Sequence, residues 1–399
     1  MSAAKPPEIK GRDLFQGASY HTGLWPHEPV DFTGKTVGVI GTGSSGVQTI
    51  PELAKQAAHL FVFQRTPTFS LPAGNRPLKD VEVQEIKQNY VDLRNRARVS
   101  PTGMASDPLP TQSALKVTPQ EREVAYEFRW QAGGTSYTRT YKDIMLVAES
   151  NETASDFARR KIQSRVSDPV LAEKLTPRDI HIGTKRLCLD TQYFETFNRD
   201  NVSLVDIRST PIQEINGVGV KTKDAEYKLD ALIFATGFDA MTGAILNIDI
   251  RTSSGLSMEE KWNAGPLTYL GLMTAGFPNL FMVTGPGSPS VLSNVVVSIE
   301  QHVEWISDCI QHLTSNSYEQ IEATQAAENN WVAHVNQLAN TTLFLNANSW
   351  YLGANVPGKP RVFMPYVGGV GRYREECTAV ANNGYTGFDI KKCVLRQRV

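Results

Sequence analysis

Apolar and polar positions divide the chain into stretches of different periodicity. Residues 35–56, KTVGVIGTGSSGVQTIPELAKQ, begin with an apolar run, pass through a glycine-rich turn and continue with helical spacing. This order predicts a strand, a tight turn and a helix. Residues 59–66, HLFVFQRT, form a nearly continuous apolar run, which is typical of a parallel strand that is buried on both faces.

The pattern changes between about Pro72 and Pro177. Charged segments with helical spacing, such as VEVQEIKQNYVDLRNRARV (81–99) and ASDFARRKIQSRV (154–166), predict a mostly helical insertion. β patterns return in NVSLVDI (201–207), in a polar hairpin near INGVGVKTKDAEYKL (215–229) and in LDALIFATGFDA (229–240). LFMVTG (280–285) resembles a strand, and SNVVVSIEQHVEWISDCIQHL (293–313) predicts a long amphipathic helix.

Composition narrows the class of protein. The 399 residues are long enough for two or three domains, and a formal net charge of −1 gives no electrostatic case for a nucleic-acid partner. No apolar run is long enough to span a bilayer, and the N-terminus lacks the apolar part of a secretory signal. Four scattered cysteines (Cys188, Cys309, Cys377 and Cys393) show neither metal spacing nor a disulfide framework. We therefore expect a reduced, cytoplasmic, enzyme-like protein without a metal site and without a membrane partner.

The turn between the first strand and the helix carries the clearest motif. Gly41, Gly43 and Gly46 form G-x-G-x-x-G, in which the first glycine permits the tight turn. The second lets a pyrophosphate approach the backbone, and the third lets helix and strand pack closely. The helix N-terminus offers free N–H groups to the phosphates. Dinucleotide binding is favoured over the alternative, a purely structural glycine turn.

The end of the second strand indicates which dinucleotide is bound. NAD and FAD sites usually have Asp or Glu there, which binds the ribose hydroxyls. This strand is followed by Arg65 and Thr66, and a cation suits a 2′-phosphate. NADP(H) is therefore favoured over NAD, and FAD is disfavoured at this turn; the alternative for Arg65 is a solvated surface residue.

The stretch FQGASYHTGLWP, which lies ahead of the first strand, could by itself be a packed aromatic linker. It matches the pattern F-x-G-x-x-x-H-x-x-x-W-P at Phe15, Gly17, His21, Trp25 and Pro26. That pattern resembles the fingerprint of the Baeyer–Villiger monooxygenases, which lies just before their NADP-binding turn. The resemblance continues in GTKRL, FATGFDA, GPGSPSVLSN and SWYLGANVPGKPRVFMPYVGG.

The resemblance implies an α/β fold, with a Rossmann-like NADP-binding domain, a helical insertion and the C-terminal part of a two-dinucleotide-binding-domain flavoprotein. The implied boundaries are 1–34 for the fingerprint linker, 35–65 and 185–229 for the NADP-binding domain, 66–184 for the insertion and 230–399 for the flavin domain. The sequence has one G-x-G-x-x-G where the family has two. We therefore expect a fragment, one part of a split enzyme with a separate N-terminal FAD-binding chain, or a protein without tightly held flavin.

The resemblance also implies roles for individual residues. Arg186 matches an arginine that stabilises the negatively charged peroxyflavin, and a guanidinium suits this because it stays protonated and offers several donors. Lys185 matches a contact to the 2′-phosphate, Trp350 a tryptophan that closes over the nicotinamide, and His21 a structural histidine. Ser290, Val291 and Leu292 match a loop that lines the substrate pocket. The implied cofactor-binding set is Gly41, Thr42, Gly43, Ser44, Ser45, Gly46, Gln48, Arg65, Thr66, Lys185, Thr236, Gly237 and Trp350.

Each of these residues also has a simpler interpretation. Without the resemblance, Lys185 and Arg186 would be a solvated pair, Trp350 a core residue and the Gly-Pro-rich loop an ordinary turn. The implied activity is NADPH- and FAD-dependent oxidation of ketones by O₂ to esters or lactones. Two alternatives stay open: a non-catalytic NADP(H)-binding module or truncated product, and a flavin-containing monooxygenase that oxygenates nitrogen or sulfur.

Overall fold

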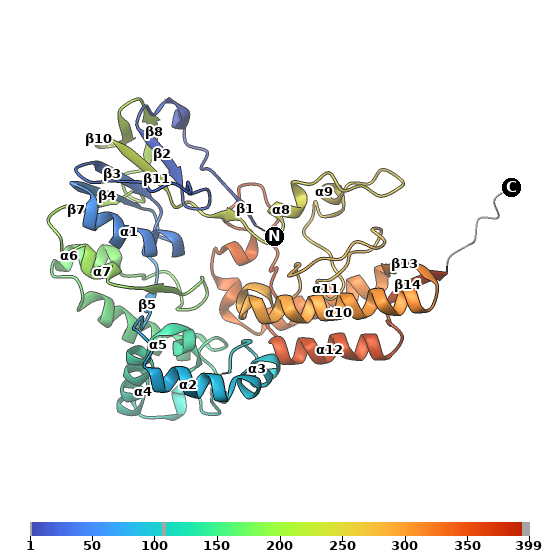
Figure 1. Ribbon diagram of the computed structural model, residues 1–399. Coiled ribbons are helices and arrows are strands. Elements are labelled where there is room, and N and C mark those ends of the chain that lie inside the picture. Colours follow the sequence, from blue (N-terminus) through green and yellow to red (C-terminus); the bar gives the residue numbers. More distant parts are fainter. Residues whose placement is uncertain (1, 106–108, 393–399) are drawn as a thin grey trace. The chain divides into compact units, whose positions relative to one another are not determined.

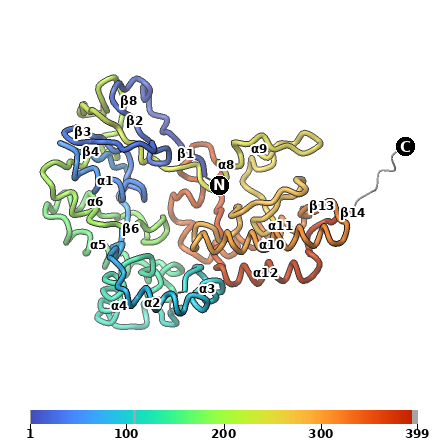
Figure 2. Tube along the Cα trace, viewed as in Figure 1, coloured from blue at the N-terminus to red at the C-terminus, as the bar shows by residue number. Residues whose placement is uncertain are grey.

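The computed structural model describes residues 2–105 and 109–392 and divides into two compact units. The first comprises 4–76 and 109–238 and is called the sheet unit below. The second comprises 1–3, 77–108 and 239–399 and is called the helical unit. The chain crosses between the units more than once, which can be followed by colour along the tube in Figure 2.

A five-stranded, all-parallel sheet forms the centre of the sheet unit (Figure 1). Its strand order is β2 (Ala18–His21), β11 (Ala231–Phe234), β3 (Thr36–Ile40), β4 (His59–Gln64) and β7 (Val202–Asp206). The strands predicted within 35–40, 59–66, 201–207 and 229–240 are confirmed. β2 is an edge strand that lies inside the predicted fingerprint linker.

Both faces of this sheet are covered, which explains why its strands are apolar runs. Val37, Val39, Leu60 and Val62 belong to a core that includes the helix α1 (Ser44–Gln56). Ile40, Phe63 and Phe234 face the opposite core, which includes Ile215 and Val220. The second core contains residues of the antiparallel strands β8 (Ile212–Asn216) and β9 (Gly219–Thr222), with β10 (Glu226–Lys228) beside β9. The polar hairpin predicted near 215–229 is thereby confirmed.

The segment predicted as one helical insertion contributes helices to both units. α4 (Pro119–Ala132), α5 (Ala148–Gln163) and α6 (Pro169–Leu175) belong to the sheet unit. This unit also contains α7 (Tyr193–Thr196) and a short ladder of β5 (Ser70–Pro72) with β6 (Cys188–Asp190). α2 (Asp80–Gln88) and α3 (Tyr90–Val99) belong to the helical unit, where Arg94 of α3 pairs with Glu300 at 2.9 Å.

Three helices share the main core of the helical unit: α10 (Val295–Ser315), α11 (Gln325–Asn340) and α12 (Val370–Asn382). The predicted long helix over 293–313 is confirmed by α10. A polar antiparallel ladder joins β13 (Tyr318–Ala323) to β14 (Phe388–Lys392). The remaining short elements are β1 (Ala3–Ala4), β12 (Phe238–Asp239), α8 (Gly243–Leu246) and α9 (Met258–Lys261), together with single 3₁₀ turns.

The prediction of a strand at LFMVTG is wrong. Residues 280–285 form no strand and are held by single backbone bonds, such as Met282 N–H to the carbonyl of Leu272 at 2.7 Å. Met282 is buried with Ile245 and Phe277. The run is apolar because it packs into this cluster, and not because it pairs in a sheet.

Candidate cofactor site

Three neighbouring strands of the sheet unit end at one edge of the sheet, and predicted site residues lie there. His21 at the end of β2 is in register with Phe234 of β11, which is in register with Ile40 of β3. Gly41 follows Ile40 directly, and Thr236 lies two residues beyond Phe234. In open parallel sheets, ligands bind at the carboxyl ends of the strands where the strand order reverses. Here the reversal lies between β11 and β3.

The three glycines of the turn meet different surroundings. Gly41 has φ 110°, and a Cβ atom on it would lie 2.5 Å from the carbonyl oxygen of Ala235. A Cβ atom on Gly46 would lie 2.3 Å from the carbonyl oxygen of Gly41. Gly43 would meet no atom within 4 Å. Packing therefore explains Gly41 and Gly46, whereas the open space at Gly43 fits a bound pyrophosphate.

The start of α1 leaves its backbone donors available. The helix begins at Ser44 after Gly43, and within the described residues no side chain caps it. Thr42 is buried and donates its hydroxyl to the carbonyl of Thr66 at 3.2 Å, which ties the turn to the end of β4. Ser45 is half-buried and Gln48 is exposed. Free N–H groups at a helix N-terminus are suited to phosphate.

Two predicted phosphate contacts lie close enough to interact. Lys185 is half-buried, and its pKa is lowered by burial and further by the positive charge of Arg65. Arg65 is exposed just after β4. No salt bridge pairs either side chain with a carboxylate within 2–105 and 109–392. Two neighbouring cations without an acidic partner favour binding of an anion such as the 2′-phosphate.

Arg186 belongs to the segment that leads into β6 of the sheet unit. It is exposed and directly follows Lys185, two residues before the buried Cys188 that opens β6. Burial raises the pKa of the Cys188 thiol, while hydrogen bonds to Thr68 and Ser44 and the charge of Arg186 oppose this shift. Because Ser44 is the first residue of α1, this contact ties the KRLC segment to the helix N-terminus.

The fingerprint residues lie before, within and after the edge strand β2, where His21 is the last residue. His21 is buried, and its Nδ1 accepts a hydrogen bond from Gly23 N–H at 3.0 Å. Burial lowers the pKa of His21, and the backbone groups of Lys5 and Gly237 oppose this shift. Burial therefore favours the neutral form of the His21 ring.

The other fingerprint residues pack locally. A Cβ atom on Gly17 would lie 2.5 Å from the ring of Phe15, so glycine allows that ring to fold back. The ring centroids of Trp25 and Tyr20 lie 5.3 Å apart, and Pro26, the residue after Trp25, is exposed. In the segment after β11, the Thr236 hydroxyl donates to the carbonyl of Lys5 at 3.2 Å, and Gly237 has φ 88°.

Predicted site residues of the helical unit also come together. Ser290, Val291 and Leu292 form a 3₁₀ turn, and Trp350 begins another. Val291, Leu292 and Trp350 all pack against a cluster that contains Tyr351 and Phe363.

Sequence reasoning missed Met241 in this unit. Met241 is buried in a cluster against which Val291 and Trp350 pack. It has φ 69°, and its neighbour Ser290 has φ 34°. Non-glycine residues with positive φ store strain and concentrate at functional sites. The residue pattern around TGFDAMTG carries no signal for this conformation.

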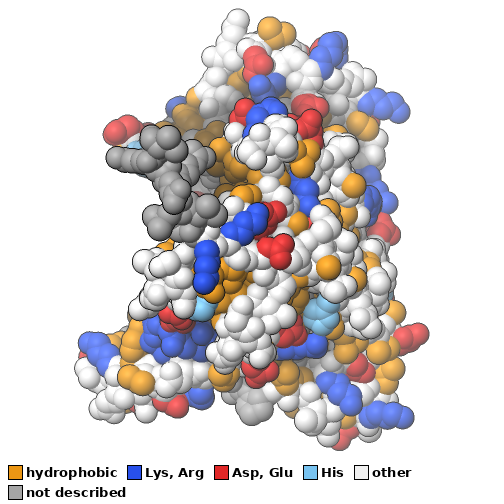
Figure 3. Space-filling model, turned by 90° about the vertical axis from the view of Figure 1, so that its right-hand side faces the viewer, with side chains coloured by type: hydrophobic (Ala, Val, Ile, Leu, Met, Phe, Trp, Pro, Cys, Tyr) orange, Lys and Arg blue, Asp and Glu red, His pale blue; other side chains and the backbone are white. Residues whose placement is uncertain are grey.

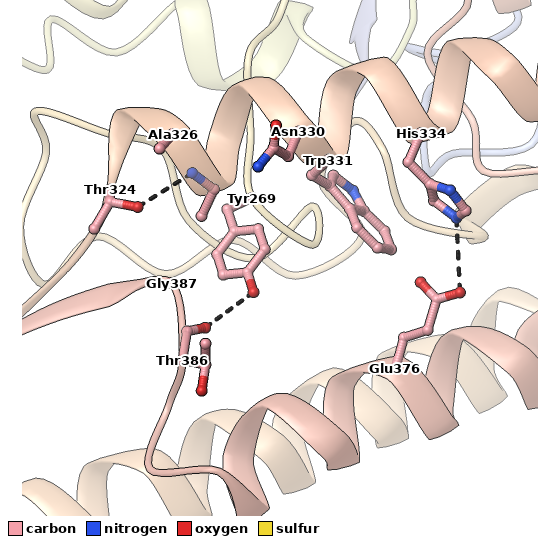
Figure 4. A pocket seen from close by; sticks show the side chains of 10 residues that line it. Tyr269, Thr324, Ala326, Asn330, Trp331, His334, Glu376, Thr386 and Gly387 are labelled. Atoms are coloured by element: carbon pink, nitrogen blue, oxygen red, sulfur yellow. Dashed lines mark hydrogen bonds and ion pairs between the residues drawn. The ribbon is translucent and has the colours of Figure 1, made fainter.

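A separate pocket of about 580 Å³ lies in the helical unit (Figure 4). None of the predicted site residues lines it; its wall includes Tyr269, Trp331, His334 and Glu376. The Tyr269 hydroxyl donates to the carbonyl of Thr386 at 3.0 Å, and Glu376 accepts from Arg372 at 2.9 Å. The carboxylate of Glu376 in the wall of this pocket is therefore already compensated by a cation of the protein.

Surface charge shows no large field of one sign on the face drawn in Figure 3, where basic, acidic and apolar side chains are interspersed. Within 2–105 and 109–392, no group of three or more His, Cys, Asp and Glu side chains is placed to hold a metal ion. No helix in the same ranges is long and apolar enough to cross a membrane. Cys188, Cys309 and Cys377 are buried free thiols, and Cys393 lies outside the described residues.

Comparison with known proteins finds relatives of this chain among monooxygenases. A cyclohexanone 1,2-monooxygenase of Acinetobacter sp is 43% identical, with 98% of this chain and 72% of the relative covered. A Baeyer–Villiger monooxygenase of Pseudooceanicola batsensis is 42% identical, with coverages of 97% and 71%. A phenazine N-monooxygenase of Lysobacter antibioticus is also 42% identical, with coverages of 96% and 70%. No family model matches the sequence.

A solved structure agrees with these relatives. The crystal structure of the OTEMO complex with FAD and NADP is 41% identical and superposes with a TM-score of 0.94, with 98% of this chain and 74% of that chain covered. The fold is that of an α/β flavoprotein of the type with two dinucleotide-binding domains. The chain belongs to the Baeyer–Villiger monooxygenase family.

Proposed function

We propose that this protein takes part in the Baeyer–Villiger oxidation of ketones to esters or lactones, with NADPH, FAD and O₂. The observation that carries the proposal is the open space at Gly43 beside the neighbouring cations Arg65 and Lys185. That combination suits a dinucleotide with a 2′-phosphate, and the relatives include a cyclohexanone 1,2-monooxygenase.

Several residues would hold NADP(H). The turn from Gly41 to Gly46 would bind the pyrophosphate through backbone N–H groups, assisted by the N-terminus of α1. Arg65, Thr66 and Lys185 would surround the 2′-phosphate, and Trp350 would cover the nicotinamide. A flavin, when bound, supplies the redox chemistry that accepts hydride and activates O₂.

The remaining roles concern charge and substrate. Arg186 would stabilise negative charge that develops beside the flavin, because its planar guanidinium presents several donors to an oxyanion. Ser290, Val291 and Leu292 would line the ketone pocket, with Val291 and Leu292 supplying apolar surface.

The flavin requires a second pyrophosphate-binding turn of its own, since each dinucleotide needs one. The sequence contains one G-x-G-x-x-G, and the relatives extend beyond the matched region. We propose that polypeptide corresponding to that additional length supplies the second turn, in the same chain or as a separate one.

An Arg65→Ala variant tests the cofactor assignment. A charge-assisted hydrogen bond contributes about 1.5–3 kcal/mol. The variant should therefore bind NADPH roughly ten- to a hundredfold more weakly, while NADH binding should change little. The measurement is a fluorescence titration of each cofactor against the 399-residue chain, with Arg12→Ala as the control, because Arg12 is a half-buried arginine of the same unit that pairs with Asp13. Equal losses for NADPH and NADH would contradict the assignment.

Oxygenation of nitrogen is a second candidate, favoured by the similarity to the phenazine N-monooxygenase. Product analysis with a cyclic ketone and with phenazine separates the two activities. A lactone from the ketone supports the first proposal, and an N-oxide without any lactone supports the second.

A further inference from the structure

A nearly buried ion pair connects two segments of the helical unit that flank predicted site residues. Lys359 Nζ lies 2.5 Å from Asp239 Oδ1 and 3.0 Å from the carbonyl oxygen of Ala240. The side chain of Lys359 is 11% exposed and that of Asp239 is 30% exposed. An ammonium group this deeply buried requires compensation, and removing one partner leaves the other charge uncompensated.

The aliphatic part of Lys359 lies against the turn that bears Trp350. Gly353 ends that turn with φ 71°, and a Cβ atom on it would stand 3.2 Å from both Cγ and Cδ of Lys359. Backbone hydrogen bonds run from Lys359 to Val356, from Val356 to Gly353 and from Gly353 to Trp350. The segment 349–359 is therefore a compact loop, and Lys359 anchors its far end.

Asp239 is held equally firmly on the other side of the pair. A Cβ atom on Gly243 would lie 2.7 Å from the Cβ of Asp239, so the start of α8 packs directly against this side chain. The next residues, Ala240 and Met241, belong to the cluster on which Trp350 packs. The ion pair and the indole ring thus attach the same loop to the same segment.

We propose that Asp239 and Lys359 are positioning residues that hold the loop 349–359 in place and thereby fix the ring of Trp350 for contact with the nicotinamide. The inference rests on the proposed role of Trp350. Without the pair, the loop would spend less time in its binding-competent arrangement, and the apparent affinity would fall in proportion to that loss. Because the nicotinamide is common to NADPH and NADH, both affinities should fall equally.

The first experiment measures the loop itself and needs no cofactor. Hydrogen exchange of the 399-residue chain should show faster exchange of the amides of Gly353, Ala354 and Val356 in Lys359→Met than in the wild type, while α11 is unchanged. Unchanged protection of these amides would overturn the inference, whatever the cofactor experiments give.

The second experiment measures cofactor affinity. Lys359→Met should weaken NADPH and NADH by the same factor, about tenfold if the competent population falls to a tenth. Lys261→Met is a matched control, because Lys261 is also 11% exposed and pairs with a buried carboxylate, Glu328, at 2.8 Å. The control should lower thermal stability and leave both affinities unchanged.

A double-mutant cycle assigns the effect to Trp350. In a Trp350→Ala background, Lys359→Met should cause little further loss of affinity. An undiminished loss there would show that Lys359 does not act through Trp350 and would overturn the proposal. The Arg65→Ala titration is independent of this cycle: it changes the ratio of NADPH to NADH affinities, whereas Lys359→Met should leave that ratio constant.

Discussion

Lys185 combines two features that make its charge sensitive to its surroundings. It is half-buried, and Arg65 adds a second positive charge nearby; both effects lower its pKa. Bound phosphate would favour the charged form of Lys185 again. The proposed 2′-phosphate site should therefore respond to pH more strongly than a site formed by ordinary surface lysines.

The prediction is that NADP⁺ binding weakens as the pH rises through the lowered pKa of Lys185. Below that pKa the ammonium is charged and attracts the phosphate; above it the attraction is lost. The loss should begin below the ordinary lysine pKa of 10.5. Lys185→Arg should remove it, because a guanidinium stays protonated. NADP⁺ titrations of the wild type and of Lys185→Arg at a series of pH values below 10.5 test this. Identical pH profiles of the two proteins would contradict the prediction.

Gly41 and Gly43 stand two residues apart but should respond differently to the same substitution. Gly41→Ala forces a side chain into φ 110° and against the carbonyl of Ala235, and such strain costs about 1–3 kcal/mol. Gly43→Ala meets only open space, so the free energy of unfolding should change by less than about 0.5 kcal/mol. Its NADPH affinity should nevertheless fall, because the methyl group would occupy the pyrophosphate position. Denaturant unfolding and cofactor titration of both variants check this contrast.

Arg186 is the residue on which the proposed chemistry depends most directly. In an oxygenating preparation that contains FAD, Arg186→Ala should retain NADPH binding and lose about 10²–10³ in the rate of ester formation. Arg186→Lys should not restore that rate, because an ammonium on a flexible stem cannot reproduce the planar fork. Wild-type rates of ketone oxygenation in Arg186→Ala would show that the residue has no catalytic role.

At the scale of elements, α10 is unusual because its first half buries polar side chains while apolar side chains on its outer side are exposed. Farther along the helix, Trp305, Cys309 and Leu313 are buried apolar residues. Ser298, Gln301 and His302 face the interior, where burial lowers the pKa of His302 to about 4. Val296, Ile299, Val303 and Ile310 are exposed, and their spacing of three, four and seven residues places them along one stripe.

Burial predicts different costs for apolar substitutions on the two sides of this helix. Val303→Ser, on the exposed stripe, should change the free energy of unfolding by less than about 0.5 kcal/mol. Leu313→Ala, on the buried side of the same helix, should cost about 2–5 kcal/mol. Urea unfolding of the two variants compares them directly, and a large loss in Val303→Ser would show that the stripe is covered in solution.

Sequence patterns located most of the sheet because its strands are buried on both faces and are therefore apolar throughout. The antiparallel ladder of β13 and β14 escaped prediction because its residues are largely polar and its partners lie far apart in the chain. A strand was wrongly predicted at LFMVTG because this segment is apolar. Its apolar residues pack in the cluster around Met282 and do not pair in a sheet. β2 was missed because only His21 of its four residues is buried.

In the candidate site, too, the sequence predicts local features but not contacts between distant segments. Gly41, Gly43 and Gly46 could be predicted from their spacing, because Gly41 and Gly46 answer local packing requirements and Gly43 leaves room for a phosphate. The proximity of Arg65 and Lys185 could not, because it depends on how the segment after α6 returns to the end of β4. The pairing of Asp239 with Lys359 lies outside any local pattern for the same reason.

At the scale of the whole molecule, the sheet is assembled from strands that are distant in sequence. β3, β4 and β7 follow one another along the chain, whereas β11 inserts between β2 and β3 and pairs residue 234 with residue 21. Such non-local pairing slows folding, because long loops must close before the contacts form.

This strand order has a consequence for the protein during its synthesis. A nascent chain that has emerged only as far as residue 230 already contains the glycine turn and the fingerprint histidine, but lacks the strand that lies between them. The carbonyl of Ala235, against which Gly41 packs, is made only after β11. Cofactor binding should therefore begin only after β11 has left the ribosome, and until then the backbone edges of β2 and β3 that pair with β11 are open to chaperones.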